Sequence, residues 1–266
     1  TLPDFEKDAT DRNRTSPFAF TGNKFEFRMV GSADSIASPN TTLNAIVAEA
    51  FCEAADELEK SKNFEKSVHD MIKKNLTEHQ RVIFNGNGYS DEWIAEAEKR
   101  GLPNIKSSIE AASSITTKKA VKLFEKFGIF TKTELVSREE IIYETYAKSI
   151  NIEALTMIGM AGKQIIPAVI EYSKELADTI NSVKAAGGDA SIEKEQLKKV
   201  SELLGKMQKA LEKLRIEDKK ASEVEDPKKQ AFYYKDKLIG CMQELRAPAD
   251  ELEMIIDKKI WPLPTY

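Results

Sequence analysis

LKKVSELLGKMQKALEKL, residues 197–214, repeats its apolar side chains in alternating steps of three and four, as the seam of a coiled coil does. The seam residues are Leu197, Val200, Leu204, Met207, Leu211 and Leu214. Asp226-Pro227 then predicts the start of a second helix, whose apolar residues have the same spacing: Ala231, Tyr234, Leu238, Cys241 and Leu245. The two patterns predict an antiparallel helical hairpin, and the charged segment from Glu217 to Glu225 is predicted to be its exposed end or turn.

The most apolar part of the chain lies ahead of this hairpin, from Ile150 to Ile170. It contains Asn151, Glu153 and Lys163, whereas a membrane-spanning helix needs about 20 predominantly apolar residues. We therefore expect a core helix on which the hairpin packs, and no membrane partner.

Helical spacing is found almost everywhere after residue 38. Ser38-Pro39 predicts a helix N-cap with proline at the first helical position. The helix behind it has a strong apolar stripe: Leu43, Ile46, Val47, Ala50, Phe51, Ala54 and Leu58. A second helix is predicted to end at the loop 85–88, shorter helices are predicted around Trp93 and Val121, and Ser137 with Glu140 predicts the capped start of another long helix.

Composition and charge are those of a water-soluble globular protein. Of 266 residues, 41% are hydrophobic and 32% charged, and a net charge of −4 provides no clustered positive face for nucleic acid. Cys52 and Cys241 each lie within an apolar helical pattern, so buried free thiols and a cytoplasmic location are expected over a disulfide. The chain opens without Met and without an apolar run, which suggests a cut inside a longer polypeptide or a processed start.

Most candidate chemical sites have a plain structural interpretation. His69 and His79 have no nearby cysteine and no ligand-like spacing, so surface or satisfied histidines are favoured over a metal site. The loop 85–88 could form a phosphate-binding nest, but it follows a helix and lacks the Gly-Lys-Ser/Thr ending of a nucleotide motif. A loop that terminates a helix is favoured there.

The N-terminal segment predicts a β-hairpin. Residues 13–21 form one predicted strand, Gly22-Asn23 a two-residue turn, and residues 24–28 the return strand. This turn places Phe20 opposite Phe25, Ala19 opposite Glu26 and Phe18 opposite Phe27. Since side chains alternate across a strand, the four phenylalanines share one face, and the other face carries three charged residues: Lys24, Glu26 and Arg28.

The charged face has the groups that metal-assisted phosphoryl transfer requires. A carboxylate such as that of Glu26 can hold Mg²⁺, and an arginine fork such as that of Arg28 can bind a carboxylate or phosphate with two hydrogen bonds. The alternative is an edge hairpin whose charges simply meet water, and the spacing leaves both possibilities open.

At these residues the chain resembles the glutamine synthetase family. Asn13-Arg14 followed by KFEFR, residues 24–28, is similar to the arginine-and-carboxylate segment near the end of the catalytic domain in that family. The longer stretch NRTSPFAFTGNKFEFR, residues 13–28, resembles the large type III class. The likeness continues through FNGNGYSDEW (84–93), RGLPN (100–104), LRAPADELE (245–253) and WPLPTY (261–266).

The resemblance implies an ATP-dependent ligase that joins ammonia to glutamate by way of γ-glutamyl phosphate, with two Mg²⁺ or Mn²⁺ ions. Glu26 would be a ligand of the metal that orients the ATP phosphates. Arg28 would bind glutamate and neutralise the transferring phosphoryl group, with Arg14 acting at the same place. Lys24 stands where other classes have an arginine near the nucleotide. Those classes also have an arginine between the Asn-Arg pair and the Glu strand, and residues 16–20 contain none.

The same resemblance implies the domain organisation. The fold class is expected to be mainly α, with the N-terminal β-hairpin left over from an α+β catalytic domain and long antiparallel helices after it. Residues 1–150 would be the remainder of the catalytic domain, with the site in the hairpin 13–30, and residues 151–266 a helical C-terminal extension. The other metal ligands would lie upstream of Thr1, so this chain alone is expected to be inactive.

Family members form double-ring homo-oligomers, and the seam 197–214 could serve either such an assembly or packing within the chain. Two other functions stay open. One is a helical interaction module that keeps the hairpin only as structure, and the other is a related ligase that attaches a different amine to glutamate.

Overall fold

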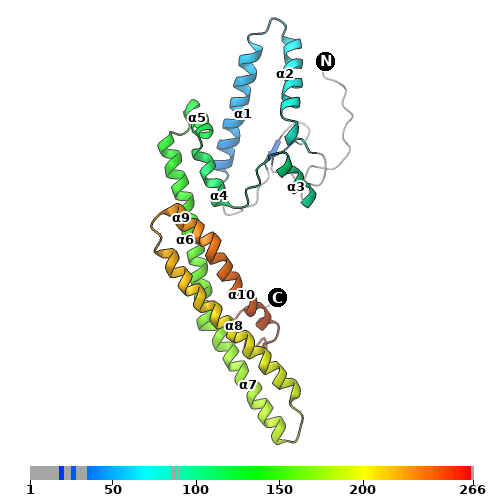
Figure 1. Ribbon diagram of the computed structural model, residues 1–266, viewed down its shortest axis with the longest axis vertical. Coiled ribbons are helices and arrows are strands. Elements are labelled where there is room, and N and C mark those ends of the chain that lie inside the picture. The colour runs from blue at the N-terminus through cyan, green and yellow to red at the C-terminus, as the bar shows by residue number, and fades with distance from the viewer. Residues whose placement is uncertain (1–17, 21–24, 28–34, 85–87, 89, 265–266) are drawn as a thin grey trace. The chain divides into compact units, whose positions relative to one another are not determined.

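The computed structural model describes residues 18–20, 25–27, 35–84, 88 and 90–264, and of the first two segments only the backbone (Figure 1). This part of the chain is mainly α-helical, as the sequence predicts. The chain divides into two compact units. Unit 1 comprises residues 1–107 and 118–131, and unit 2 comprises residues 108–117 and 132–266.

Unit 1 contains two short strands, β1 (Phe18–Phe20) and β2 (Phe25–Phe27). They pair antiparallel, with Phe18 opposite Phe27, Ala19 opposite Glu26 and Phe20 opposite Phe25. This is the register that a two-residue turn requires. The turn residues 21–24 lie outside the described part, so the turn and the two side-chain faces stay predictions.

Unit 1 contains a pair of longer helices, α1 (Ala37–Leu58) and α2 (Phe64–Glu78) (Figure 1). Its other helical elements are short: the 3₁₀ turn η1 (Gln80–Val82), α3 (Asp91–Lys99) and α5 (Lys118–Lys126). Helices α3 and α5 confirm the short helices predicted around Trp93 and Val121. The Asn63 side chain caps α2 by accepting a hydrogen bond from the amide of Lys66.

Two helix ends in unit 1 differ from the predictions. Helix α1 begins at Ala37, so the predicted N-cap at Ser38 is wrong, and it is the Ser35 hydroxyl that accepts a hydrogen bond from the Ala37 amide. Pro39 lies within the first turn, where its missing N–H costs nothing because the first amides of a helix have no partner inside it. Helix α2 ends at Glu78, and η1 separates it from the loop 85–88.

Unit 2 is a bundle of long helices. Its elements are α4 (Ser108–Ala112), the 3₁₀ turn η2 (Ser113–Thr116), α6 (Lys132–Met160), the π-helical turn η3 (Ala161–Ile165), α7 (Ile166–Ala185), α8 (Ser191–Ser222), α9 (Pro227–Tyr233), the π-helical turn η4 (Tyr234–Leu238) and α10 (Ile239–Glu253). None of the described helices combines the length and the apolar character of a membrane-spanning segment.

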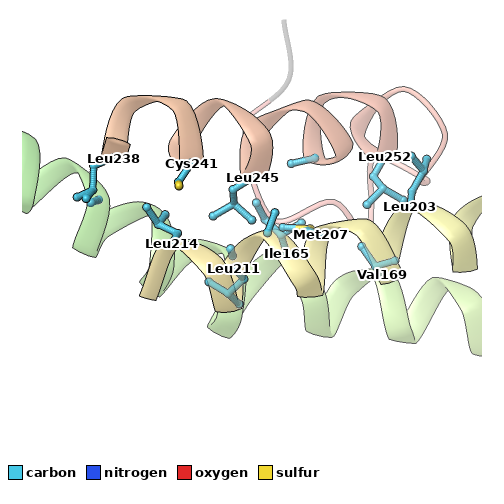
Figure 2. Packing of buried hydrophobic residues seen from close by; sticks show 14 of the residues in the cluster. Ile165, Val169, Leu203, Met207, Leu211, Leu214, Leu238, Cys241, Leu245 and Leu252 are labelled. Atoms are coloured by element: carbon cyan, nitrogen blue, oxygen red, sulfur yellow. The ribbon is translucent and has the colours of Figure 1, made fainter. Parts of the chain in front are cut away.

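The core of unit 2 lies where α8 and α10 meet the long α6–α7 segment (Figure 2). Val200, Met207 and Leu214 of the seam are fully buried, while Leu197 and Leu204 are partly buried against the same cluster. Two leucines of α10 are buried with them, Leu245 and Leu252. The predicted antiparallel hairpin on a core helix is confirmed, and packing within the chain accounts for the seam.

The two cysteines are free, as the sequence predicts. Cys241 is buried in the core of unit 2, and this burial raises the pKa of its thiol. Cys52 on α1 is only half-buried, so the expectation of two buried thiols is correct for one of them. Cys241 lies among the buried residues of α8 and α10, whereas Ala45 is the buried residue of α1.

The apolar stretch 150–170 is helical throughout but changes its winding at η3. The amide of Ile166 bonds to the carbonyl of Ala161, five residues back, and Pro167 follows immediately. Proline has no amide to donate and its ring collides with the carbonyl of the residue four positions earlier, so a widened turn relieves the crowding.

Two helix boundaries in unit 2 differ from those that the sequence predicts. Helix α6 begins at Lys132, so Ser137 and Glu140 lie inside it and form no capping box. Helix α8 continues through Glu217 to Ser222, so the turn between the two seams is shorter than the segment 217–225. Helix α6 also crosses Ile150 without a break, so residues 150 and 151 belong to one compact unit. The catalytic-domain boundary predicted there stays a prediction.

Candidate functional site

The predicted catalytic hairpin lies mostly outside the described residues. Arg14, Lys24 and Arg28 all fall there. Glu26 lies in β2, paired with Ala19 of β1, and only its backbone is described. The roles of these four residues therefore stay predictions.

Metal-ligating side chains do not gather elsewhere in the described part of the chain. Within residues 35–84, 88 and 90–264, no three His, Cys, Asp or Glu side chains come together as a metal site would require. His69 and His79 are both exposed, the former on α2 and the latter at its C-terminal end.

A cluster of aromatic and charged side chains joins two of the sequence motifs in unit 1. The rings of Phe84 and Trp93 stack with their centroids 3.9 Å apart and their planes 20° from parallel. The Arg100 guanidinium lies 5.5 Å from the centre of the Trp93 ring, within the range of a cation–π contact. The motifs 84–93 and 100–104 therefore meet in space at these three side chains.

Arg100 also forms hydrogen bonds with the residues that precede the loop 85–88. Its Nη1 donates to the carbonyl of Ile83 at 2.9 Å and to that of Arg81 at 3.4 Å, and its Nε donates to Glu96 at 2.6 Å. The hydrogen bond from Arg100 holds the pKa of the Glu96 carboxyl below its usual range. One side chain thus ties the end of α3 to the residues that precede the loop.

Local sequence explains how α3 presents Arg100. The Ser90 hydroxyl accepts a hydrogen bond from the amide of Trp93 and caps the N-terminus of α3. Gly101 ends the helix with φ of 68°, which glycine adopts without a Cβ penalty, and the amide of Leu102 reaches back to the carbonyl of Ala97. The sequence predicts both motifs but does not predict that Arg100 connects them. An arginine at the end of a predicted helix, followed directly by glycine, was the pattern that could have indicated this role.

In unit 2, partly buried polar groups hold helices together. Glu139 accepts hydrogen bonds from the Thr116 hydroxyl at 2.6 Å and from the Tyr143 hydroxyl at 2.9 Å. Asp218 accepts one from the Asn151 amide at 2.9 Å, and burial raises the pKa of the Asp218 carboxyl. Both carboxylates thus have a partner on another segment, which is what a packing role requires.

The comparisons with known proteins concern both units. Residues 67–184 match the family model described as the glutamine synthetase C-terminal domain. A glutamine synthetase of Butyrivibrio fibrisolvens is 41% identical to this chain, and the match covers 98% of this chain. The type-3 glutamine synthetase of Dictyostelium discoideum is 37% identical, and that match covers the whole of this chain. A glutamine synthetase of Bacteroides fragilis is 33% identical, also over the whole chain.

The chain spans only part of these relatives. It covers 38%, 37% and 38% of their lengths, respectively. The match to the C-terminal domain model and the continuous likeness to a type-3 enzyme agree with each other. Residues 67–184 therefore match a glutamine synthetase C-terminal domain, and the chain as a whole is homologous to part of glutamine synthetases, a type-3 enzyme among them.

Proposed function

We propose that this chain is the C-terminal segment of an ATP-dependent glutamate–ammonia ligase, and that it contributes one edge of the active site. The observation that carries the proposal is the identity of 37% to 41% with curated glutamine synthetases over essentially the whole chain. In the proposed reaction the terminal phosphoryl group of ATP passes to the γ-carboxylate of glutamate and ADP leaves. Ammonia then displaces phosphate to form the amide of glutamine.

The residues of the N-terminal segment would supply fixed charge to this reaction, in a hairpin that belongs to an α+β catalytic domain. Glu26 would be one ligand of a divalent metal, Mg²⁺ or Mn²⁺, which when bound neutralises and orients the phosphates. Arg28 and Arg14 would hold the glutamate and the transferring phosphoryl group, because an arginine fork matches both carboxylate and phosphate. Lys24 would contact the nucleotide. Positive groups fixed where negative charge develops are commonly the largest catalytic contribution in such transfers.

One carboxylate is too few for a two-metal site, and the described residues offer no second cluster of ligands. Further ligands would therefore come from outside the described part of the chain. The active assembly would accordingly be the longer polypeptide, as a cytoplasmic homo-oligomer, and not this chain alone.

The test is release of phosphate that requires ATP, glutamate and ammonia together. It compares the polypeptide extended upstream through its native reading frame, residues 1–266 alone, and the long form with Glu26→Gln. We expect activity in the long form only, reduced roughly a hundredfold or more by Glu26→Gln, since the loss of one transition-state charge contact commonly has that effect. Glu195→Gln on the exposed face of α8 is the matched control and should leave the rate unchanged.

Two results would contradict the proposal in different ways. An inactive long form whose helices are intact would favour the helical interaction module. Glutamine formation by residues 1–266 alone would show that the chain needs no upstream ligands. Replacing ammonia with other amines in the same assay separates a glutamine synthetase from a related glutamate–amine ligase.

A further inference from the structure

We infer that one face of α1 is a docking surface for the part of a type III glutamine synthetase that lies outside this chain, an inference that rests on the proposed function. The surface consists of six apolar residues, here named the α1 stripe: Leu43, Ile46, Val47, Ala50, Phe51 and Ala54.

Four of the six residues of the α1 stripe are exposed to solvent, although its pattern is that of a buried face, and Leu43 and Ala54 are half-buried. Phe51 is 72% exposed, Ile46 50% and Val47 36%. The seam of α8 has the same kind of spacing, and there Val200 and Met207 are fully buried. A helix with an apolar stripe ordinarily buries it, and a contiguous exposed patch of this kind marks an interaction site.

Unit 1 packs the opposite face of α1. Ala45 is the buried residue of this helix, and Glu49, one turn further along, accepts a hydrogen bond from Lys126 of α5. By the 3.6-residue period, Ala45 and Glu49 lie on the far side of the helix from Val47 and Ala50. Helix α5 therefore covers the back of α1. Helix α2 also contacts α1, where its Lys74 pairs with Glu57, but Phe51 and Ile46 of the α1 stripe stay exposed.

The length of the relatives identifies that body. This chain covers no more than 38% of each relative, so most of a type III enzyme lies outside it. Strand β2, which contains Glu26, ends at Phe27, and α1 begins at Ala37. Docking of the α1 stripe on the larger part would anchor the chain shortly after this strand and bring Glu26 to the remaining metal ligands.

Thiol labelling tests the docking without depending on catalysis. Ala50→Cys is introduced in a Cys52→Ala background, both in residues 1–266 and in the polypeptide extended through its native reading frame; Cys241 is buried. We expect Cys at position 50 to react with a maleimide readily in residues 1–266 and at least roughly tenfold more slowly in the long form, because reaction there requires local opening. The matched control Ala185→Cys, at the exposed end of α7, should react equally in both.

Three outcomes would overturn the inference. Equal labelling at position 50 in both forms would show that the larger part does not cover the α1 stripe. Protection in residues 1–266 that increases with concentration, with a dimer in sedimentation, would assign the surface to a second copy. Protection in monomeric residues 1–266 would assign it to the chain's own N-terminal residues. A protected but inactive long form would refute the ligase proposal and leave the docking intact.

Discussion

At the residue scale, Glu217 shows how a charge that looks solvated in sequence acquires a structural role. Its carboxylate accepts a hydrogen bond from Lys220 at 2.7 Å and another from the Tyr233 hydroxyl at 2.6 Å. These bonds hold the pKa of Glu217 below its ordinary value, and the same contact raises the pKa of Tyr233 to about 12. The pairing joins α8 to α9 across the turn.

This pairing predicts a specific loss of stability in acid. Because the folded-state pKa of Glu217 is lowered, its contribution is present above the ordinary carboxyl pKa of 4.5 and is lost as pH falls through the folded value. Between neutral pH and about pH 3, the free energy of unfolding should therefore fall more in the wild type than in Glu217→Gln. Urea denaturation at both pH values measures the difference.

The control for this experiment is Glu212→Gln, an exposed carboxylate on the same helix. It should keep the pH dependence of the wild type. If the free energy of unfolding of Glu217→Gln depends on pH as strongly as that of the wild type, protonation of Glu217 does not affect stability. The contact with Tyr233 then has no part in the loss of stability in acid.

At the element scale, the α8–α10 pair depends on its apolar seam. Leu211 is 1% exposed in the core that Figure 2 shows, whereas Ile216 of the same helix is 48% exposed. The two residues have similar side-chain volume, so the difference in burial alone separates their expected effects.

We expect Leu211→Ala to lower the free energy of unfolding of unit 2 by about 2–5 kcal/mol, because it removes buried methyl groups and leaves a cavity. Ile216→Ala should change it by about 0.5 kcal/mol or less, as exposed substitutions usually do. Urea unfolding in a Trp93→Phe background, followed by the fluorescence of Trp261 in the same cluster, measures both. Equal effects of the two variants would mean that the seam is not the stabilising contact.

At the scale of the whole molecule, the two units differ in how much apolar surface their described residues bury. Helix α1 contributes only Ala45 to the buried core, and α2 and α3 contribute no buried residue, whereas one cluster runs from α6 to the residues after α10 in unit 2. Since burial of apolar surface is the main favourable term in folding, unit 1 should be the less stable unit in this chain.

The chain's two tryptophans make this difference measurable, because Trp93 lies in unit 1 and Trp261 in unit 2. In Trp261→Phe the remaining Trp93 should report an unfolding transition at lower urea than Trp261 reports in Trp93→Phe. The two-state approximation would then hold for each unit and not for the chain. Coincident transitions in the two variants would show that the chain unfolds as one cooperative body.

Much of the helical architecture follows from local rules that the sequence displays directly. The 3.6-residue spacing of apolar side chains is a property of consecutive residues, so it predicts the α8 seam, the second helix of the hairpin and the stripe of α1 without knowledge of any contact. The family resemblance likewise depends on short motifs, and the comparisons confirm it over the whole chain.

Other features depend on contacts between residues that are distant in sequence, and no local pattern contains them. The period of an apolar stripe does not say whether a partner exists, so the stripes of α8 and α1 look alike in sequence while one is buried and the other is exposed. A capping signal such as Ser137 with Glu140 can occur inside a helix as well as at its start, and here α6 begins earlier, at Lys132, and buries Leu135 ahead of that signal.

The pairing of Arg100 with the carbonyls of Arg81 and Ile83, and that of Glu217 with Tyr233, were beyond sequence reasoning for the same reason. Both depend on where separate segments come to lie after folding. Local spacing determines which residues can form a helix and which face of it is apolar, because those properties involve neighbours in sequence. Burial, pKa shifts and the choice of partner for each face arise only when distant segments meet, because desolvation and hydrogen bonding depend on the groups that surround a side chain in space.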